Sequence, residues 1–190
     1  MSLPLLSLLV LTPLAGVVAI WLLPARAARH VVAFAMLVTL LLATAVLLAY
    51  EPPGPRFQMI ERVGWISSLN VDYLLGVDGI SVLFLPATAL LFLGSLVACW
   101  NAVEDAPRLH YSLLLLLQMA TLGIFCALDT VLFFVFWELT LVPLYFLLGR
   151  RGVSSSSSRA AARYFLIMLA GEFSSLWLAR TRRAEAVQRY

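Results

Sequence analysis

The sequence predicts an all-α integral membrane protein, a polytopic transmembrane bundle of about six spanning helices. Of its 190 residues, 63% are hydrophobic and only 12% are charged, and the mean hydropathy is +0.98. A soluble domain is roughly half apolar and a quarter charged, so this chain lies outside that class. The apolar residues also gather in runs close to the roughly 20 residues that a helix needs to cross a bilayer.

Six apolar runs are long enough to span, and none shows the apolar/polar alternation typical of a transmembrane β-strand. Because the bilayer core offers no hydrogen-bond partners, each run must satisfy its own backbone as a helix. The predicted spans are residues 3–23, 31–50, 80–100, 110–128, 130–149 and 160–179. They form one helical bundle over residues 1–179, which is followed by an atypical Arg-rich tail at 180–190.

The longest connection between spans is residues 51–79, which opens with a turn-rich Pro/Gly stretch. A short hairpin or an interfacial segment is predicted there, with Trp65 and Tyr73 at the depth of the lipid headgroups. Asp78 precedes the third span, and Asp129 fills the gap between the fourth and fifth spans. Since Asp is a favoured N-cap, both residues are predicted to cap the helix that follows.

All 13 basic residues are Arg, and their distribution predicts the orientation of the chain. With the N-terminus outside the cytoplasm, the segment 51–79 is extracytoplasmic and carries two arginines, Arg56 and Arg62. Seven then lie on or near the cytoplasmic side, namely Arg26, Arg29, Arg108, Arg150, Arg151, Arg159 and Arg163. The positive-inside rule therefore favours an extracytoplasmic N-terminus in a multi-pass protein of the plasma membrane, although the tail arginines break the pattern.

Glu138 is the main candidate for chemistry, because it lies in the middle of the fifth apolar run. An ionised carboxylate there costs about 2.5–3.5 kcal/mol on insertion scales, so it must pair, face the bundle interior or carry a proton. A carboxyl group that changes between these states is suited to a proton relay. Pro143 removes a backbone donor five residues later and can kink the helix. The alternatives are a Glu hydrogen-bonded between helices and a Pro tolerated by its packing.

Glu172 is a second carboxylate at membrane depth, in a segment that loses its apolar character after Gly171. Other chemical motifs are missing from the sequence. His30 and His110 lack ligands at metal-site spacing, and the two Cys residues, Cys99 and Cys126, fall within apolar runs, where Cys behaves as a small hydrophobe. The sequence therefore predicts neither a metal site nor a bound cofactor.

Residues 134–150 (Phe-Val-Phe-Trp-Glu-Leu-Thr-Leu-Val-Pro-Leu-Tyr-Phe-Leu-Leu-Gly-Arg) show a family resemblance. Together with Leu75-Gly76-Val77-Asp78-Gly79-Ile80-Ser81, they resemble the M subunit of proton-pumping NADH:quinone oxidoreductase, the bacterial counterpart of mitochondrial complex I subunit 4. The resemblance covers roughly residues 1–170. It implies a membrane-arm subunit in the bacterial inner membrane that couples quinone reduction to proton transfer, with Glu138 as proton relay. NADH, flavin and iron–sulfur clusters would be held by other subunits of the complex.

The chain also departs from that family's pattern. The family pairs the glutamate with a lysine on its seventh helix, and this sequence contains no Lys. An N-terminal fragment with a frameshift near Gly171 is the simplest account, in which Glu172 has no role. Two other functions stay open: a subunit of a multi-subunit Mrp-type cation/proton antiporter, and an inert membrane fragment.

Overall fold

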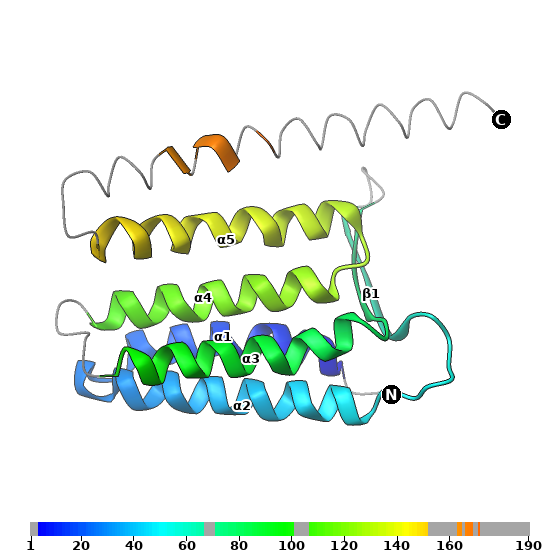
Figure 1. Cartoon of the computed structure of the whole chain (residues 1–190), viewed down its shortest axis with the longest axis horizontal. Helices are drawn as coiled ribbons and strands as arrows, with labels where there is room; N and C mark the ends of the chain where they lie inside the picture. The colour runs from blue at the N-terminus through cyan, green and yellow to red at the C-terminus, as the bar shows by residue number, and fades with distance from the viewer. Residues whose placement is uncertain are drawn as a thin grey trace. The chain divides into compact units, whose positions relative to one another are not determined.

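The computed structural model describes residues 4–66, 71–100, 107–151, 163–164, 166–168 and 171. Within these residues, five helices are long and apolar enough to cross a membrane (Figure 1). They are α1 (Leu5–Leu22), α2 (Ala28–Leu48), α3 (Ser81–Ala98), α4 (Pro107–Cys126) and α5 (Thr130–Arg151). The predicted fold class is confirmed, and the chain is a multi-pass membrane protein. The sixth predicted span, 160–179, lies outside the described residues except for short pieces.

Helices α1 to α4 pack as one bundle in which consecutive helices run in alternating directions (Figure 1). Gly16 of α1 lets three helices meet closely: a Cβ at this position would lie 2.7 Å from the Cβ of Ala35 in α2 and 3.0 Å from Leu115 Cδ1 in α4. At the end of α1, Arg108 of α4 donates from Nη2 to the Leu23 carbonyl at 2.6 Å. This cation therefore lies at a helix C-terminus, where the helix dipole favours positive charge.

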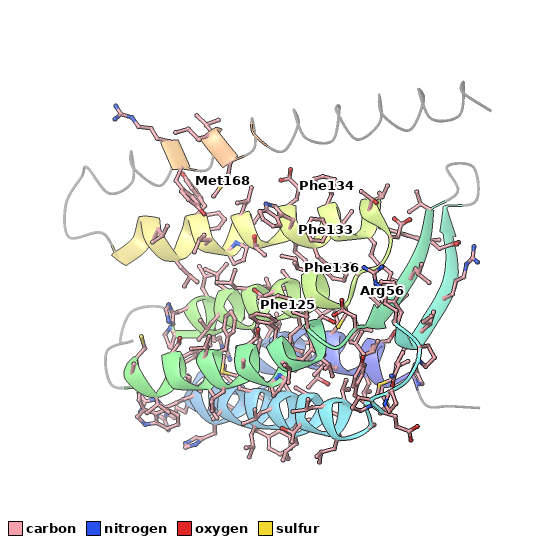
Figure 2. All side chains as sticks on the ribbon, turned by 45° about the vertical axis from the view of Figure 1, so that its right-hand side comes forward. Arg56, Phe125, Phe133, Phe134, Phe136 and Met168 are labelled. Carbon is pink, nitrogen blue, oxygen red and sulfur yellow. The ribbon has the colours of Figure 1, made fainter. Side chains whose placement is uncertain are left out.

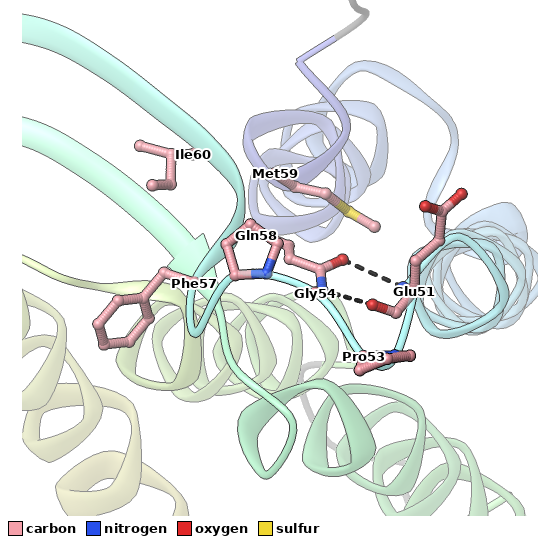
Figure 3. A pocket seen from close by; sticks show the side chains of 8 residues that line it. Glu51, Pro53, Gly54, Phe57, Gln58, Met59 and Ile60 are labelled. Atoms are coloured by element: carbon pink, nitrogen blue, oxygen red, sulfur yellow. Dashed lines mark hydrogen bonds between the residues drawn. The ribbon is translucent and has the colours of Figure 1, made fainter.

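The connection between α2 and α3 contains a β-hairpin, one of the two alternatives predicted for it, at the opposite end of the bundle from the start of α4 (Figure 1). Strand β1 (Gln58–Ile66) pairs antiparallel with β2 (Val71–Val77), with Arg62 opposite Leu74. Before β1, the Gln58 side-chain amide makes two hydrogen bonds with the backbone of Glu51: its Nε2 donates to the carbonyl at 2.8 Å and its Oε1 accepts from the N–H at 3.1 Å (Figure 3). These two bonds hold the ends of the turn-rich stretch together. The residues of this loop line an open pocket on the surface.

Glu61 of β1 fastens the hairpin to the first helix. Its carboxylate accepts hydrogen bonds from the backbone N–H groups of Leu6 (2.7 Å) and Ser7 (2.9 Å) and from Ser7 Oγ (2.5 Å). The Tyr73 hydroxyl lies 3.3 Å from the same Oγ, and burial of this phenol raises the pKa of Tyr73. The first N–H groups of a helix have no intrahelical partner and attract negative charge. Glu61 therefore caps α1 from a strand far away in the sequence.

We expect Glu61→Gln to lower the free energy of unfolding of the chain by about 1–2 kcal/mol, because the amide removes the charge and turns one acceptor into a donor. The measurement is a denaturant titration in mixed micelles. Glu51→Gln is the matched control, since Glu51 is exposed and its hydrogen bonds with other described residues are made by its backbone. Equal unfolding free energies for the two variants would contradict a capping role for Glu61.

Both predicted aspartate caps are present. Asp78 Oδ1 accepts from the N–H groups of Ile80 (3.1 Å) and Ser81 (2.7 Å), and the bond from Ser81 holds the pKa of Asp78 below its usual value. Asp129 Oδ1 accepts from Val131 (2.8 Å) and Leu132 (3.1 Å) in the first turn of α5. Each cap satisfies N–H groups that the helix itself cannot satisfy. The start of α5 is therefore fixed by a local side-chain interaction.

Candidate proton-relay site in helix α5

Glu138 lies about midway along α5, with its side chain half-buried. Its neighbours on the helix that face the bundle are Phe136 and Leu141, both buried, while Trp137 is exposed. Within the described part of the chain, Glu138 makes no hydrogen bond or ion pair. A carboxylate at this depth costs about 2.5–3.5 kcal/mol unless it is paired or protonated. Glu138 is therefore a half-buried carboxyl group inside a spanning helix that has no partner among the described residues.

The contact between α4 and α5 sets the depth of Glu138. Phe136 packs its ring against Gly123 of α4 so closely that a Cβ on Gly123 would overlap the ring. In Figure 2, Phe136 lies on the side of α5 that faces α4, whereas Phe134 lies on the opposite side. Because α4 and α5 run antiparallel, Thr121 of α4 lies level with Glu138. Gly123 thus allows α5 to approach α4 closely near the depth of Glu138.

Two features of α5 change the backbone hydrogen bonding next to Glu138. Pro143 is buried within α5 and has no N–H, so the Leu139 carbonyl cannot receive the usual bond from four residues ahead. Thr140 Oγ1 donates to the Trp137 carbonyl at 2.7 Å. The Leu139 carbonyl, which lacks its usual intrahelical donor, and the Thr140 hydroxyl therefore follow directly after the carboxylate. Helix α5 continues through Pro143 to Arg151, and a kink at Pro143 stays a prediction.

The other residues that the sequence singled out contribute little to this site. Glu172 lies outside the described residues. His30 packs edge-on against Trp100, and His110 packs against Tyr111. Among the residues that the structure describes, no group of three or more His, Cys, Asp or Glu side chains could hold a metal ion.

Sequence reasoning did not single out Gln118 of α4. This side chain is fully buried, and neither Oε1 nor Nε2 has a partner within the described residues. A buried amide without hydrogen bonds costs about 1–3 kcal/mol per polar group, so its environment requires an explanation. The only signal in the sequence was one amide within the apolar run of residues 113–120.

A polytopic helix bundle with a carboxylate at mid-depth defines a class of membrane protein found in proton-translocating systems. Comparison with known proteins narrows this class. Residues 127–179 match the family described as "NADH:quinone oxidoreductase/Mrp antiporter, TM". This segment contains all of α5 and therefore Glu138.

Curated relatives match over most of the chain. Subunit M of the F(420)H(2) dehydrogenase from Methanosarcina mazei is 34% identical over 185 residues, which cover 93% of this chain and 37% of that protein. NADH-quinone oxidoreductase subunit M from Mycobacterium tuberculosis is 36% identical over 202 residues, covering 90% of this chain and 36% of its own length. The chain thus spans little more than a third of the length of these relatives. The predicted resemblance to M-type subunits is confirmed.

Solved structures agree with this assignment. A chain of respiratory complex I from Thermus thermophilus with bound NADH has a TM-score of 0.75 and 27% sequence identity, with 88% of this chain and 33% of that chain covered. A chain of the membrane-bound sulfane sulfur reductase, an archaeal respiratory membrane complex, has a TM-score of 0.72 at 20% identity. The second likeness shows the fold alone. The fold of the chain is thus similar to folds found in two respiratory membrane complexes.

Proposed function

We propose that this chain forms part of a proton-translocating, non-redox subunit in the membrane arm of an NADH:quinone oxidoreductase. The observation that carries the proposal is Glu138, a half-buried carboxyl group at mid-depth in a segment that matches the oxidoreductase/antiporter family. Its partners are other membrane-arm subunits and the lipid bilayer. By itself the chain is not a catalyst, because quinone reduction is carried out by other subunits of the complex.

The proposed mechanism uses the alternation of Glu138 between a protonated and an ionised state. In the apolar surroundings of α5 the neutral form needs no counter-ion, so Glu138 can hold a proton at mid-membrane. The ionised form needs a donor or a cation nearby, and this group must come from outside the described residues. A change in the position of that group, driven by the redox reaction, would load and release the proton.

Two relatives that are about equally identical to this chain support the proposal that the subunit has no redox site of its own. Their names differ in the electron donor, F(420)H(2) in one and NADH in the other, although this chain matches both to the same extent. A segment that is shared between dehydrogenases with different donors serves a step that they have in common. We infer that this step is proton transfer and that NADH, flavin, iron–sulfur clusters and quinone bind elsewhere in the complex.

A subunit of an Mrp-type cation/proton antiporter is the second candidate, because the family that matches residues 127–179 includes both kinds of protein. The subunit names of the curated relatives favour the oxidoreductase. The test is Glu138→Gln in the assembled complex, purified through a tag on this chain. Loss of proton transfer during quinone reduction, with the other subunits still recovered, supports the proposal. Recovery of a sodium/proton antiporter that lacks redox activity would contradict it.

We propose that the chain lies in the bacterial plasma membrane with its N-terminus and its hairpin outside the cytoplasm. Arg56→Cys, on the exposed loop before β1, is then expected to react with a membrane-impermeant maleimide in intact cells. Arg26→Cys, exposed at the opposite end of the bundle, is the matched control and should react only after permeabilisation. The parent chain, with Cys99 and Cys126 alone, gives the background. The reverse pattern of labelling would invert the topology.

A further inference from the structure

Basic and aromatic side chains gather where α2 begins and α3 ends, at the opposite end of the bundle from the hairpin (Figure 1). The guanidinium carbon of Arg29 lies 5.4 Å from the centroid of the Trp100 ring. The His30 ring packs edge-on against the same indole, with the ring centroids 6.3 Å apart. Trp100 also packs against the buried core at this end of the bundle. The indole therefore gives both cationic and polar neighbours a fixed place on the surface.

Arg26 brings a second guanidinium group to this place. It lies in a short 3₁₀ helix (Ala25–Ala27) that runs directly into α2, and its side chain is exposed. Residues three and four apart on a helix lie on the same side, so Arg26 lies about one turn before Arg29 and His30. We call Arg26, Arg29, His30 and Trp100 the arginine–tryptophan cluster. It offers two permanent positive charges and, from the histidine ring, a further N–H donor.

The positive charge of this cluster is not neutralised within the part of the chain that the structure describes. The one ion pair among these residues joins Arg62 to Asp72 in the hairpin, at the other end of the bundle. The first turn of α2 contains no acidic residue. Because the start of a helix itself carries partial positive charge, two arginines there raise the positive potential further. The cluster therefore favours an anion.

The arginine–tryptophan cluster lies at the depth expected for lipid headgroups. Helices α2 and α3 are both long and apolar enough to span, and α2 begins at Ala28 while α3 ends at Ala98. Arginine and tryptophan are common where spanning helices leave the hydrocarbon. From exposed His30, an exposed apolar stripe of α2 runs into the membrane and consists of Phe34, Leu37 and Leu41. An anion at the cluster thus lies next to a surface that acyl chains can cover.

We propose that the arginine–tryptophan cluster binds the phosphate group of an anionic phospholipid, whose acyl chains lie along the exposed stripe of α2. The phosphate oxygens accept charge-assisted hydrogen bonds from Arg26 and Arg29 and a hydrogen bond from the His30 ring. Trp100 holds Arg29 in position through the cation–π contact. A zwitterionic lipid carries its own cation beside the phosphate, so the cluster prefers a lipid with net negative charge, such as phosphatidylglycerol. This lipid site does not depend on proton transfer by Glu138.

Glu104 and Asp105 are the alternative partners of the two arginines. Both lie in the connection 101–106 between α3 and α4, outside the described residues. Ion pairs formed within the chain would neutralise the arginines and remove the preference for an anionic lipid. Lipid selectivity therefore separates the two cases.

The test is native mass spectrometry of the purified chain in detergent, with dioleoyl phosphatidylglycerol or dioleoyl phosphatidylcholine added. These lipids share their acyl chains and differ in net charge. We expect the parent chain to bind phosphatidylglycerol more tightly. Arg26→Gln and Arg29→Gln are each expected to weaken this binding about fivefold (about 1 kcal/mol), the usual contribution of one arginine beside anionic lipid, and to leave phosphatidylcholine binding unchanged. Because Arg26 is exposed, Arg26→Gln is not expected to disturb the fold.

Arg56→Gln is the matched control for the loss of charge. Arg56 also lies 5.4 Å from the centroid of an aromatic ring, that of Phe57, but it belongs to the loop before β1 at the other end of the bundle. This variant is expected to bind phosphatidylglycerol as tightly as the parent chain does. Equal affinities of the parent chain for the two lipids would overturn the proposal, as would an equal loss of phosphatidylglycerol binding in Arg56→Gln and the cluster variants.

Discussion

Glu138→Gln is expected to lower proton translocation by the assembled complex by about two orders of magnitude, the lower end of what a positioned acid–base group contributes. The amide keeps the shape of the side chain and its place beside Phe136, but it cannot bind and release a proton. The helix bundle should therefore form normally. The measurement is the proton gradient formed by inverted membrane vesicles during quinone reduction, related to the amount of complex recovered.

Two variants separate the loss of the titratable group from other effects. Glu138→Asp keeps a carboxyl group at nearly the same place and is expected to retain part of the activity. Glu51→Gln removes a carboxylate from the exposed loop before β1 and is expected to change nothing. Full proton translocation by Glu138→Gln would contradict the relay role. Equal losses in Glu138→Gln and Glu138→Asp would point to a role in packing.

Gly123→Ala is expected to lower the free energy of unfolding by about 1–3 kcal/mol, the usual cost of overpacking a tight contact. The added methyl group would overlap the Phe136 ring, so α4 and α5 must move apart. Because this contact sets the depth of Glu138, proton translocation is expected to fall as well. A denaturant titration in mixed micelles measures the first effect and the vesicle assay measures the second.

Gly94→Ala in α3 is the matched control for this substitution. No heavy atom lies within 4 Å of a Cβ built at Gly94, so the new methyl group meets nothing. Alanine is the better helix former by about 0.5–1 kcal/mol, and Gly94→Ala should leave stability unchanged or raise it. If Gly123→Ala also leaves stability unchanged or raises it, the close packing of Gly123 against Phe136 is not required for the stability of the chain.

The helices could be predicted from the sequence because the bilayer imposes both their length and their composition. Asp78 and Asp129 were also predictable, since a cap acts on the N–H groups of the next few residues. Glu61 was not predictable, because it caps α1 across 55 positions of sequence. The partner of such a side chain depends on how the hairpin folds back over the bundle, and no local pattern carries this information.

The buried polar residues near mid-membrane also differ in whether the sequence could predict them. Glu138 is conspicuous in the sequence because a carboxylate in an apolar run has a large energetic cost. Gln118 has no formal charge and was overlooked. Its complete burial depends on how the neighbouring helices pack around it, which no local pattern predicts.

The most direct test of the proton-relay role of Glu138 is redox-induced infrared difference spectroscopy of the purified complex that carries this chain. A carboxyl group that gains or loses a proton during the reaction changes its C=O stretching band. We predict that such a band is present in the parent complex, shifted in Glu138→Asp and missing in Glu138→Gln. Identical carboxyl bands in the parent complex and Glu138→Gln would contradict the account, because Glu138 would then keep one protonation state throughout the reaction.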